Sequence, residues 1–192
     1  MIARTLAAWA ALALWAAGAP ALAAEEAWVV EARSVSMDVP PKLLAVLQAE
    51  IAKSGPEGAI EACQVQAPAL ARAASERTGW SVKRVSLRNR NPKAVPDAWE
   101  RAALEDFDRR AAAHEPAAKL ERYEAVQEDG KTVWRYMRAL PTAELCLACH
   151  GAPDQLSPAV KAKLAALYPD DRATGYRVGD IRGAMTLRKP AP

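Results

Sequence analysis

The chain has 192 residues and carries 26 Lys and Arg against 23 Asp and Glu, which gives a formal net charge of +3 at pH 7. Because the charges are nearly balanced and interspersed, the sequence gives no indication of a nucleic-acid partner. The length is that of one domain, and the hydrophobic fraction of 51% is high largely because of alanine.

Residues 1–23 have the pattern of a secretory signal peptide. Arg4 precedes an apolar run over residues 6–17, and small residues at Ala21 and Ala23 fit the −3 and −1 positions of a cleavage site. The run is short for a membrane helix, which needs about 20 residues, although an uncleaved anchor is the alternative. We predict cleavage near Ala23, export to the periplasm, and a mature single domain over residues 24–192 with no membrane span.

Three helices are expected in the first half of the mature chain. The segment 24–39 has a helical pattern that Pro40-Pro41 should end. Residues 42–53 form an amphipathic helix that stops at Ser54-Gly55-Pro56, and another helix follows over residues 56–77. The apolar face of this last helix consists of Ile60, Cys63, Ala67, Leu70 and Ala74.

The second half of the chain is predicted to contain strands with helices between them. Alternating side chains at residues 80–87 predict a strand, and Asp97 is a suitable N-cap for a helix that ends near residue 113. Two β-prone runs flank Asp129-Gly130, a pair typical of a hairpin turn. The hairpin strands are expected at 120–126 and 132–140, a short helix at 158–167, and one or two closing strands at 175–188. Helices followed by an antiparallel sheet make an α+β fold.

The sequence Cys146-Leu147-Ala148-Cys149-His150 is a C-x-x-C-H motif. Its two thiols are spaced to form thioether bonds to one haem, and the adjoining imidazole can then reach the iron as an axial ligand. The motif occurs once, so we predict one covalent haem c, attached through Cys146 and Cys149 and ligated by His150.

Two other interpretations of this motif fit the chain less well. A structural zinc site needs four ligands, and the rest of the chain offers only Cys63 and His114. A thioredoxin-like redox motif would follow an N-terminal strand in a βαβ unit, whereas residues 146–150 lie near the C-terminus. Covalent haem is therefore the preferred interpretation.

The residues alone leave the sixth ligand of the iron open. Cys63 is the odd cysteine in an oxidising compartment and lies on an apolar helix face, but a free cysteine is equally often a small core residue. His114 is at an expected helix end, where an exposed histidine is common. The remaining candidates are Met37, Met137 and Met185.

Five segments occur in an order that matches one protein family. They are residues 59–68, 84–92, 96–100, 146–151 and 175–184. They resemble a bacterial family of periplasmic c-type haem domains with a PAS-like fold, first known from a cyanobacterial c-type haem protein and long described as a domain of unknown function. The resemblance implies that His150 and Cys63 hold the iron. One departure is Ala94, near which the family often has an asparagine.

A thiolate and an imidazole would favour ferric iron and a low reduction potential, and the thiolate could protonate and leave on reduction. Arg84, Arg88 and Arg90 are candidate partners of the haem propionates, or else a solvated basic edge. We expect a haem-binding, redox-active protein, cytochrome-like and not an enzyme, that transfers electrons to an unidentified redox partner. The alternative is a redox or gas (NO/CO) sensor that acts through a signalling partner protein.

Overall fold

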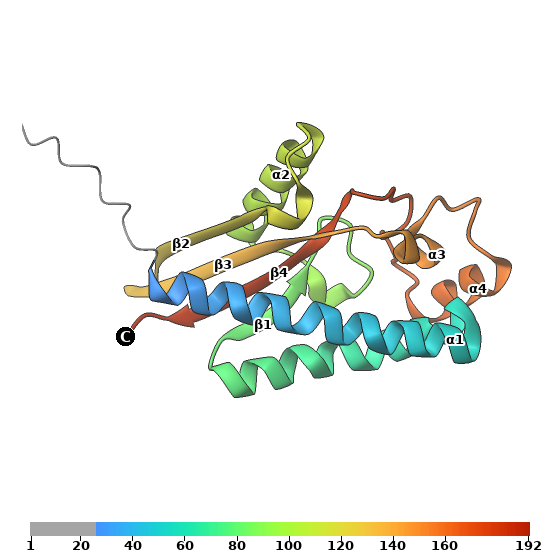
Figure 1. Ribbon diagram of the computed structural model, residues 1–192, viewed down its shortest axis with the longest axis horizontal. Helices are drawn as coiled ribbons and strands as arrows, with labels where there is room; N and C mark the ends of the chain where they lie inside the picture. The colour runs from blue at the N-terminus through green and yellow to red at the C-terminus, as the bar shows by residue number, and fades with distance from the viewer. Residues whose placement is uncertain (1–25) are drawn as a thin grey trace, which may run out of the picture.

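A computed structural model describes residues 26–192, so the predicted signal peptide lies outside the described residues. The fold is α+β, as expected from the sequence (Figure 1). The helices are α1 (Ala27–Thr78), α2 (Ala98–Ala112), α3 (Leu147–His150) and α4 (Pro158–Leu167), and the strands are β1 (Ser81–Val85), β2 (Glu121–Glu128), β3 (Lys131–Pro141) and β4 (Ile181–Pro190). Between residues 26 and 192, no helix is long and apolar enough to cross a membrane.

Helix α1 is a hairpin of two arms. The chain turns back at Gly55, whose φ of 69° and ψ of 175° are accessible essentially only to glycine. Figure 1 shows the arms, residues 27–54 and 56–78, running in opposite directions. They are linked by an ion pair between Arg77 and Asp38. The break expected at residues 54–56 is therefore confirmed.

The prediction that the helix ends at Pro40-Pro41 is wrong, because α1 continues through both prolines. Each proline lacks the N–H that would bond the carbonyl one turn earlier, so the helix is locally weakened. Val35 and Val39, 8% and 5% exposed, hold the preceding turn in the core. This tertiary burial offsets the lost hydrogen bonds, since packing contributes most of the stability of a helix in a protein.

The strands form one antiparallel sheet in the order β1-β4-β3-β2. The predicted hairpin is confirmed: β2 and β3 pair directly, and Asp129 and Gly130 both have positive φ in the turn between them. The closing segment supplies one strand, β4, which lies between β1 and β3. Gly183 of β4 allows this position, because a Cβ there would lie 2.4 Å from the carbonyl oxygen of Val85.

The two faces of the sheet are covered by different helices. The first arm of α1 packs on one face, where the core includes Trp28, Val29 and Leu187. Helix α2 packs on the other face through Leu104 and Phe107. Asp97 caps α2 as predicted, and a capping box with Glu100 completes its first turn. The sheet thus has an apolar core on each of its faces.

A third apolar cluster lies beyond the end of the sheet. Ile60, from the second arm of α1, packs there with Leu156 and with two residues of α4, Val160 and Leu164. Figure 1 shows α3 and α4 together at the end of the molecule where α1 turns back. This cluster holds the segment that follows α3 against the second arm.

Glu100 is expected to be one of the most important polar residues for stability. Its carboxylate is 1% exposed and accepts hydrogen bonds from Thr186 and from the backbone N–H of Asp97, and it lies 3.5 Å from the buried guanidinium of Arg135. We expect Glu100→Ala to lower the free energy of unfolding by about 2 kcal/mol, because loss of the carboxylate leaves the buried hydroxyl of Thr186 without its acceptor, whereas Arg135 keeps Asp97 and Glu128. Urea denaturation checks this, with Glu100→Gln as the milder control; equal midpoints for Glu100→Ala and wild type would contradict it.

Candidate functional site

The C-x-x-C-H turn, residues 146–150, is a single helical turn held at both ends. Cys146 closes a 3-10 turn (Glu144–Cys146), and α3 begins at the next residue. After α3, the N–H of Gly151 bonds the carbonyl of Leu147, and a Cβ on Gly151 would lie 2.7 Å from that same oxygen. One turn of helix puts Cys146 and Cys149 on the same side, as two thioether bonds to one porphyrin require.

The imidazole of His150 is held in a defined orientation. Its Nδ1 lies 2.6 Å from the carbonyl oxygen of Ala173. Since a carbonyl can only accept, Nδ1 carries the proton, and Nε2 keeps the lone pair that a metal ligand needs. Burial, together with the charges of Arg182 and Arg90, holds the pKa of His150 well below its usual value. The ring is therefore neutral at pH 7.

Cys63 comes into the same region from the second arm of α1. The side chain is half-buried and in no disulfide, as are Cys146 and Cys149. Burial raises the pKa of the Cys63 thiol, and the charges of Arg84 and Arg90 oppose this shift. The Cys149 thiol lies 3.7 Å from the carbonyl oxygen of Pro56, at the start of the same arm, so the arm that carries Cys63 contacts the C-x-x-C-H turn.

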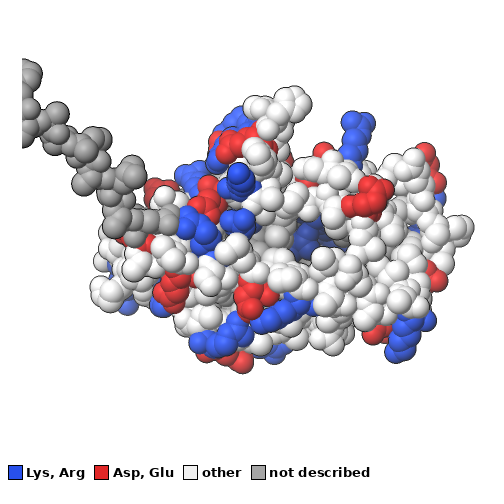
Figure 2. Space-filling model, viewed as in Figure 1, with Lys and Arg blue, Asp and Glu red and all other residues white. Residues whose placement is uncertain are grey.

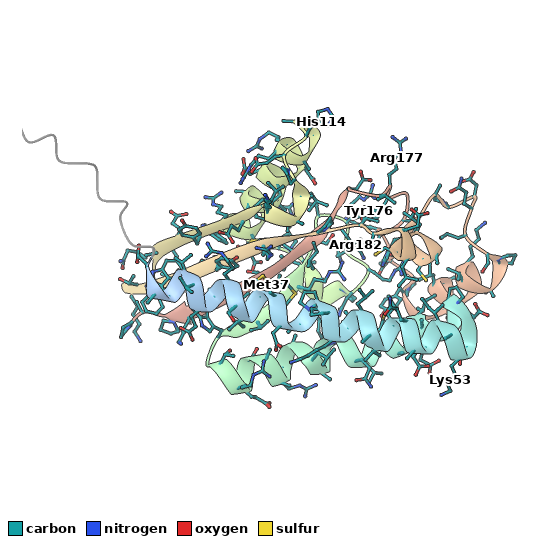
Figure 3. The ribbon with its side chains drawn as sticks, in the orientation of Figure 1. Met37, Lys53, His114, Tyr176, Arg177 and Arg182 are labelled. Atoms are coloured by element: carbon teal, nitrogen blue, oxygen red, sulfur yellow. The ribbon has the colours of Figure 1, made fainter. Side chains whose placement is uncertain are left out.

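The other ligand candidates come from other parts of the fold, and of these His114 lines a cavity together with Arg88 and Tyr176. His114 is exposed just after α2, at φ 65°, and Figure 3 shows it at the tip of that helix, on the side of the sheet opposite α1. Met37 is 46% exposed on the first arm of α1. Met185 and Met137 are buried in the two cores of the sheet, and neither core includes a residue of the C-x-x-C-H turn.

Two arginines near the turn lack a carboxylate partner. Arg84 of β1 is half-buried and, within residues 26–192, makes no hydrogen bond or ion pair. Arg182 of β4 is 6% exposed; it donates to the hydroxyl of Ser86 and the carbonyl of Arg88, while its Nε has no partner. Burial and the charge of Arg84 lower the pKa of Arg182 to about 9.

Arg182 was not predicted from the sequence. A signal was present, since an arginine interrupts the otherwise apolar start of β4, but a surface position explains such a residue equally well. Figure 2 shows basic side chains set back in a hollow near α3, and Figure 3 shows Arg182 and Tyr176 together in this region. The Arg182 guanidinium lies 5.0 Å from the centre of the Tyr176 ring.

The other two predicted arginines have different surroundings. Arg88 is exposed and stacks on Tyr176, with 3.7 Å from its guanidinium carbon to the ring centre. Tyr176 lies edge-on to His150, with 6.3 Å between the ring centres. Arg90 forms an ion pair with Asp171 and donates to the carbonyl of Cys149 at 2.6 Å. Arg90 is therefore already engaged with the protein, whereas Arg84 and Arg182 are available to bind an anion.

In the described part of the chain, no group of three or more His, Cys, Asp and Glu side chains could hold a bare metal ion. The side chains around the turn instead suit a metal held in a porphyrin. Two thiols could attach the porphyrin, one neutral imidazole and the thiol of Cys63 could bind the metal, and buried cations lie nearby. Buried cations without counter-ions are costly, and the two carboxylates of a haem would supply the missing charge.

An antiparallel sheet, a helical hairpin that carries one thiol, and a C-x-x-C-H turn beside it define a class of small C-x-x-C-H domains. The model of the Tll0287-like family matches residues 19–190, so the chain belongs to the Tll0287-like family. A crystal structure of the cyanobacterial heme-protein Tll0287 is 26% identical, with a TM-score of 0.64 over 88% of this chain and 98% of that chain. No curated protein sequence matches significantly. The family expected from the sequence is thus confirmed.

Proposed function

We propose that this chain binds one haem covalently through Cys146 and Cys149, with His150 and Cys63 as the axial ligands. The observation that carries this proposal is the hydrogen bond from His150 Nδ1 to the carbonyl of Ala173, which leaves Nε2 free. A backbone acceptor of this kind commonly orients a metal-bound histidine. The similarity to a heme-protein supports the same conclusion.

The uncompensated cations support the position of the propionates. Within residues 26–192, Arg84 and Arg182 are the arginines that are not exposed and yet have no ion pair with a carboxylate, and Arg88 is exposed beside them. Guanidinium groups pair well with carboxylates. We assign the propionates to Arg84 and Arg182 first and to Arg88 second, since Arg90 is bound to Asp171.

The proposed activity is one-electron transfer at low potential in the periplasm, without catalysis, to a redox partner protein. A bound haem supplies the one-electron chemistry. The chain supplies a thiolate at Cys63, whose negative charge favours ferric iron, and a neutral imidazole at His150. The thiolate lowers the potential relative to a haem in which methionine takes the place of Cys63.

The second candidate function is a sensor of redox state or of NO or CO. It is favoured by the possibility that Cys63 leaves the iron on reduction. Burial raises the pKa of its thiol, so protonation of the sulfur is favoured once the iron is reduced and binds thiolate less strongly. Release of this sulfur would open one coordination position for a diatomic gas. A sensor of this kind would act through a separate signalling partner protein.

The two candidates are separated by spectroscopy of protein made with a c-haem maturation system. Denatured protein should retain one haem per chain, and the ferric spectrum should be low-spin with a thiolate charge-transfer band. If the iron of the reduced protein stays six-coordinate and the protein does not bind CO, electron transfer is supported. Rapid CO binding after reduction supports the sensor, and the absence of covalent haem would overturn both candidates.

Arg182→Met is expected to destabilise the haem-bound protein but not the haem-free protein. Without haem, Arg182 is a buried cation with no carboxylate, so its removal should leave the melting temperature unchanged or raise it. With haem, removal leaves a propionate unpaired and should lower the melting temperature. Thermal melts of both forms check this, with Arg177→Met, an exposed arginine of the same region, as the control. Equal effects on the two forms would contradict the propionate assignment.

A further inference from the structure

An ion pair behind the C-x-x-C-H turn connects three separate segments of the chain. Arg90, in the loop after β1, donates from Nε and Nη2 to Asp171 at 3.1 and 3.0 Å. Its Nη2 also donates to the carbonyl of Cys149 at 2.6 Å and to that of Ala173 at 3.4 Å. One guanidinium therefore contacts both the turn and Ala173, whose carbonyl accepts the hydrogen bond from His150 Nδ1.

Further hydrogen bonds hold two of these segments, residues 171–176 and the C-x-x-C-H turn, against each other. The other oxygen of the Asp171 carboxylate accepts the N–H of Ala173 at 2.8 Å. The N–H groups of Gly175 and Tyr176 donate to the carbonyls of Gly151 and His150 at 2.7 and 2.9 Å. The segment that contains Ala173 is thus fixed against the turn, and its carbonyl can be neither rotated nor withdrawn without breaking several contacts.

The pair is also shielded from solvent. The side chains of Arg90 and Asp171 are only 11% and 10% exposed. Charges in such a position act on their neighbours through a lower effective dielectric than surface charges do, and salt screens them less. A change to either charge would therefore be felt at the imidazole of His150.

We propose that Arg90 and Asp171 are positioning residues that orient the His150 imidazole and set the reduction potential of the iron, an inference that rests on the proposed haem. Arg90 acts in two ways. Its charge favours the reduced iron, which carries one positive charge fewer, and its N–H competes with His150 Nδ1–H for the carbonyl of Ala173, which limits the electron density on the imidazole. The charge of Asp171 opposes the first effect.

Substitution of each partner alone is expected to shift the potential in opposite directions. Arg90→Met removes the positive charge and the competing donor, so the potential should fall. Asp171→Asn keeps an oxygen that can accept the Ala173 N–H but leaves Arg90 uncompensated, so the potential should rise. The double variant should lie between the two single variants. Spectroelectrochemical titration of the haem-loaded proteins measures all three values.

The control is Arg109→Met, which breaks an exposed ion pair with Asp106 on α2 and should leave the potential unchanged. Arg90→Lys keeps the charge and should restore most of the wild-type value. Shifts of Arg90→Met and Asp171→Asn in the same direction, or no shift in either, would overturn the proposal; if Arg90→Met does not fold, Asp171→Asn and Arg90→Lys decide it. Loss of haem from wild type would instead contradict the proposed function.

Discussion

A Cys146→Ala/Cys149→Ala protein is expected to lose all covalently attached haem while its fold remains. Both thiols lie on one side of a single helical turn, and neither is in a disulfide. Their removal abolishes both thioether bonds, so denaturation should release any haem that is still bound through iron. Haem staining after denaturing electrophoresis and a pyridine haemochrome spectrum measure the loss.

The single variants provide the matched control for this result. Cys146→Ala and Cys149→Ala should each retain one thioether bond, which gives reduced haem content and a haemochrome band shifted by the unreacted vinyl group. Cys63→Ala should retain both bonds. Covalent haem in the double variant, or its loss from Cys63→Ala, would contradict the attachment through Cys146 and Cys149.

Local signals in the sequence predicted the elements that local chemistry determines. Asp97 starts α2 because its carboxylate accepts the N–H of Glu100. Asp129 and Gly130 make the hairpin because both adopt positive φ. Gly55 turns α1 back for a similar reason. At each of these positions, the residue type and its immediate neighbours suffice for the prediction.

Features that depend on distant residues were not predictable in this way. The helix α1 continues through Pro40-Pro41 because Val35 and Val39 are packed in the core. The strength of these contacts is not visible in a local sequence pattern, so the prediction of a helix end there was wrong. The partner of Arg90 is Asp171, which is 81 residues away in the sequence, and no periodicity relates the two. Long-range ion pairs of this kind require the fold itself.

The site combines both kinds of information. The C-x-x-C-H motif was readable because covalent chemistry fixes its spacing within five residues. The sixth ligand of the iron could not be chosen among Cys63, His114 and the methionines in this way, because the choice depends on which side chain the fold brings beside the motif. The contact of the Cys149 thiol with Pro56, on the arm that carries Cys63, and the exposure of His114 on the opposite side of the sheet favour Cys63.

Cys63→Ala is expected to abolish the thiolate signature of the ferric protein and to raise its reduction potential. Removal of the sulfur withdraws a negative charge that favours ferric iron. Axial ligands set haem potentials over a range of roughly 0.8 V, so an increase on the order of 0.1 V or more is expected. Absorption spectra and spectroelectrochemical titration measure the two effects, and Gln64→Ala, an exposed neighbour on the same arm, is the control.

The same variant distinguishes the two proposed functions. If Cys63 leaves the iron on reduction, the ferrous wild type and ferrous Cys63→Ala should bind CO at similar rates, because both present an open position. If Cys63 stays bound, only the variant should bind CO rapidly. Identical ferric spectra for wild type and Cys63→Ala would instead exclude Cys63 as a ligand, and His114→Ala would then be the next variant to measure. Ligation by Cys63 is thus tested by the ferric spectra, and retention of its sulfur after reduction by CO binding.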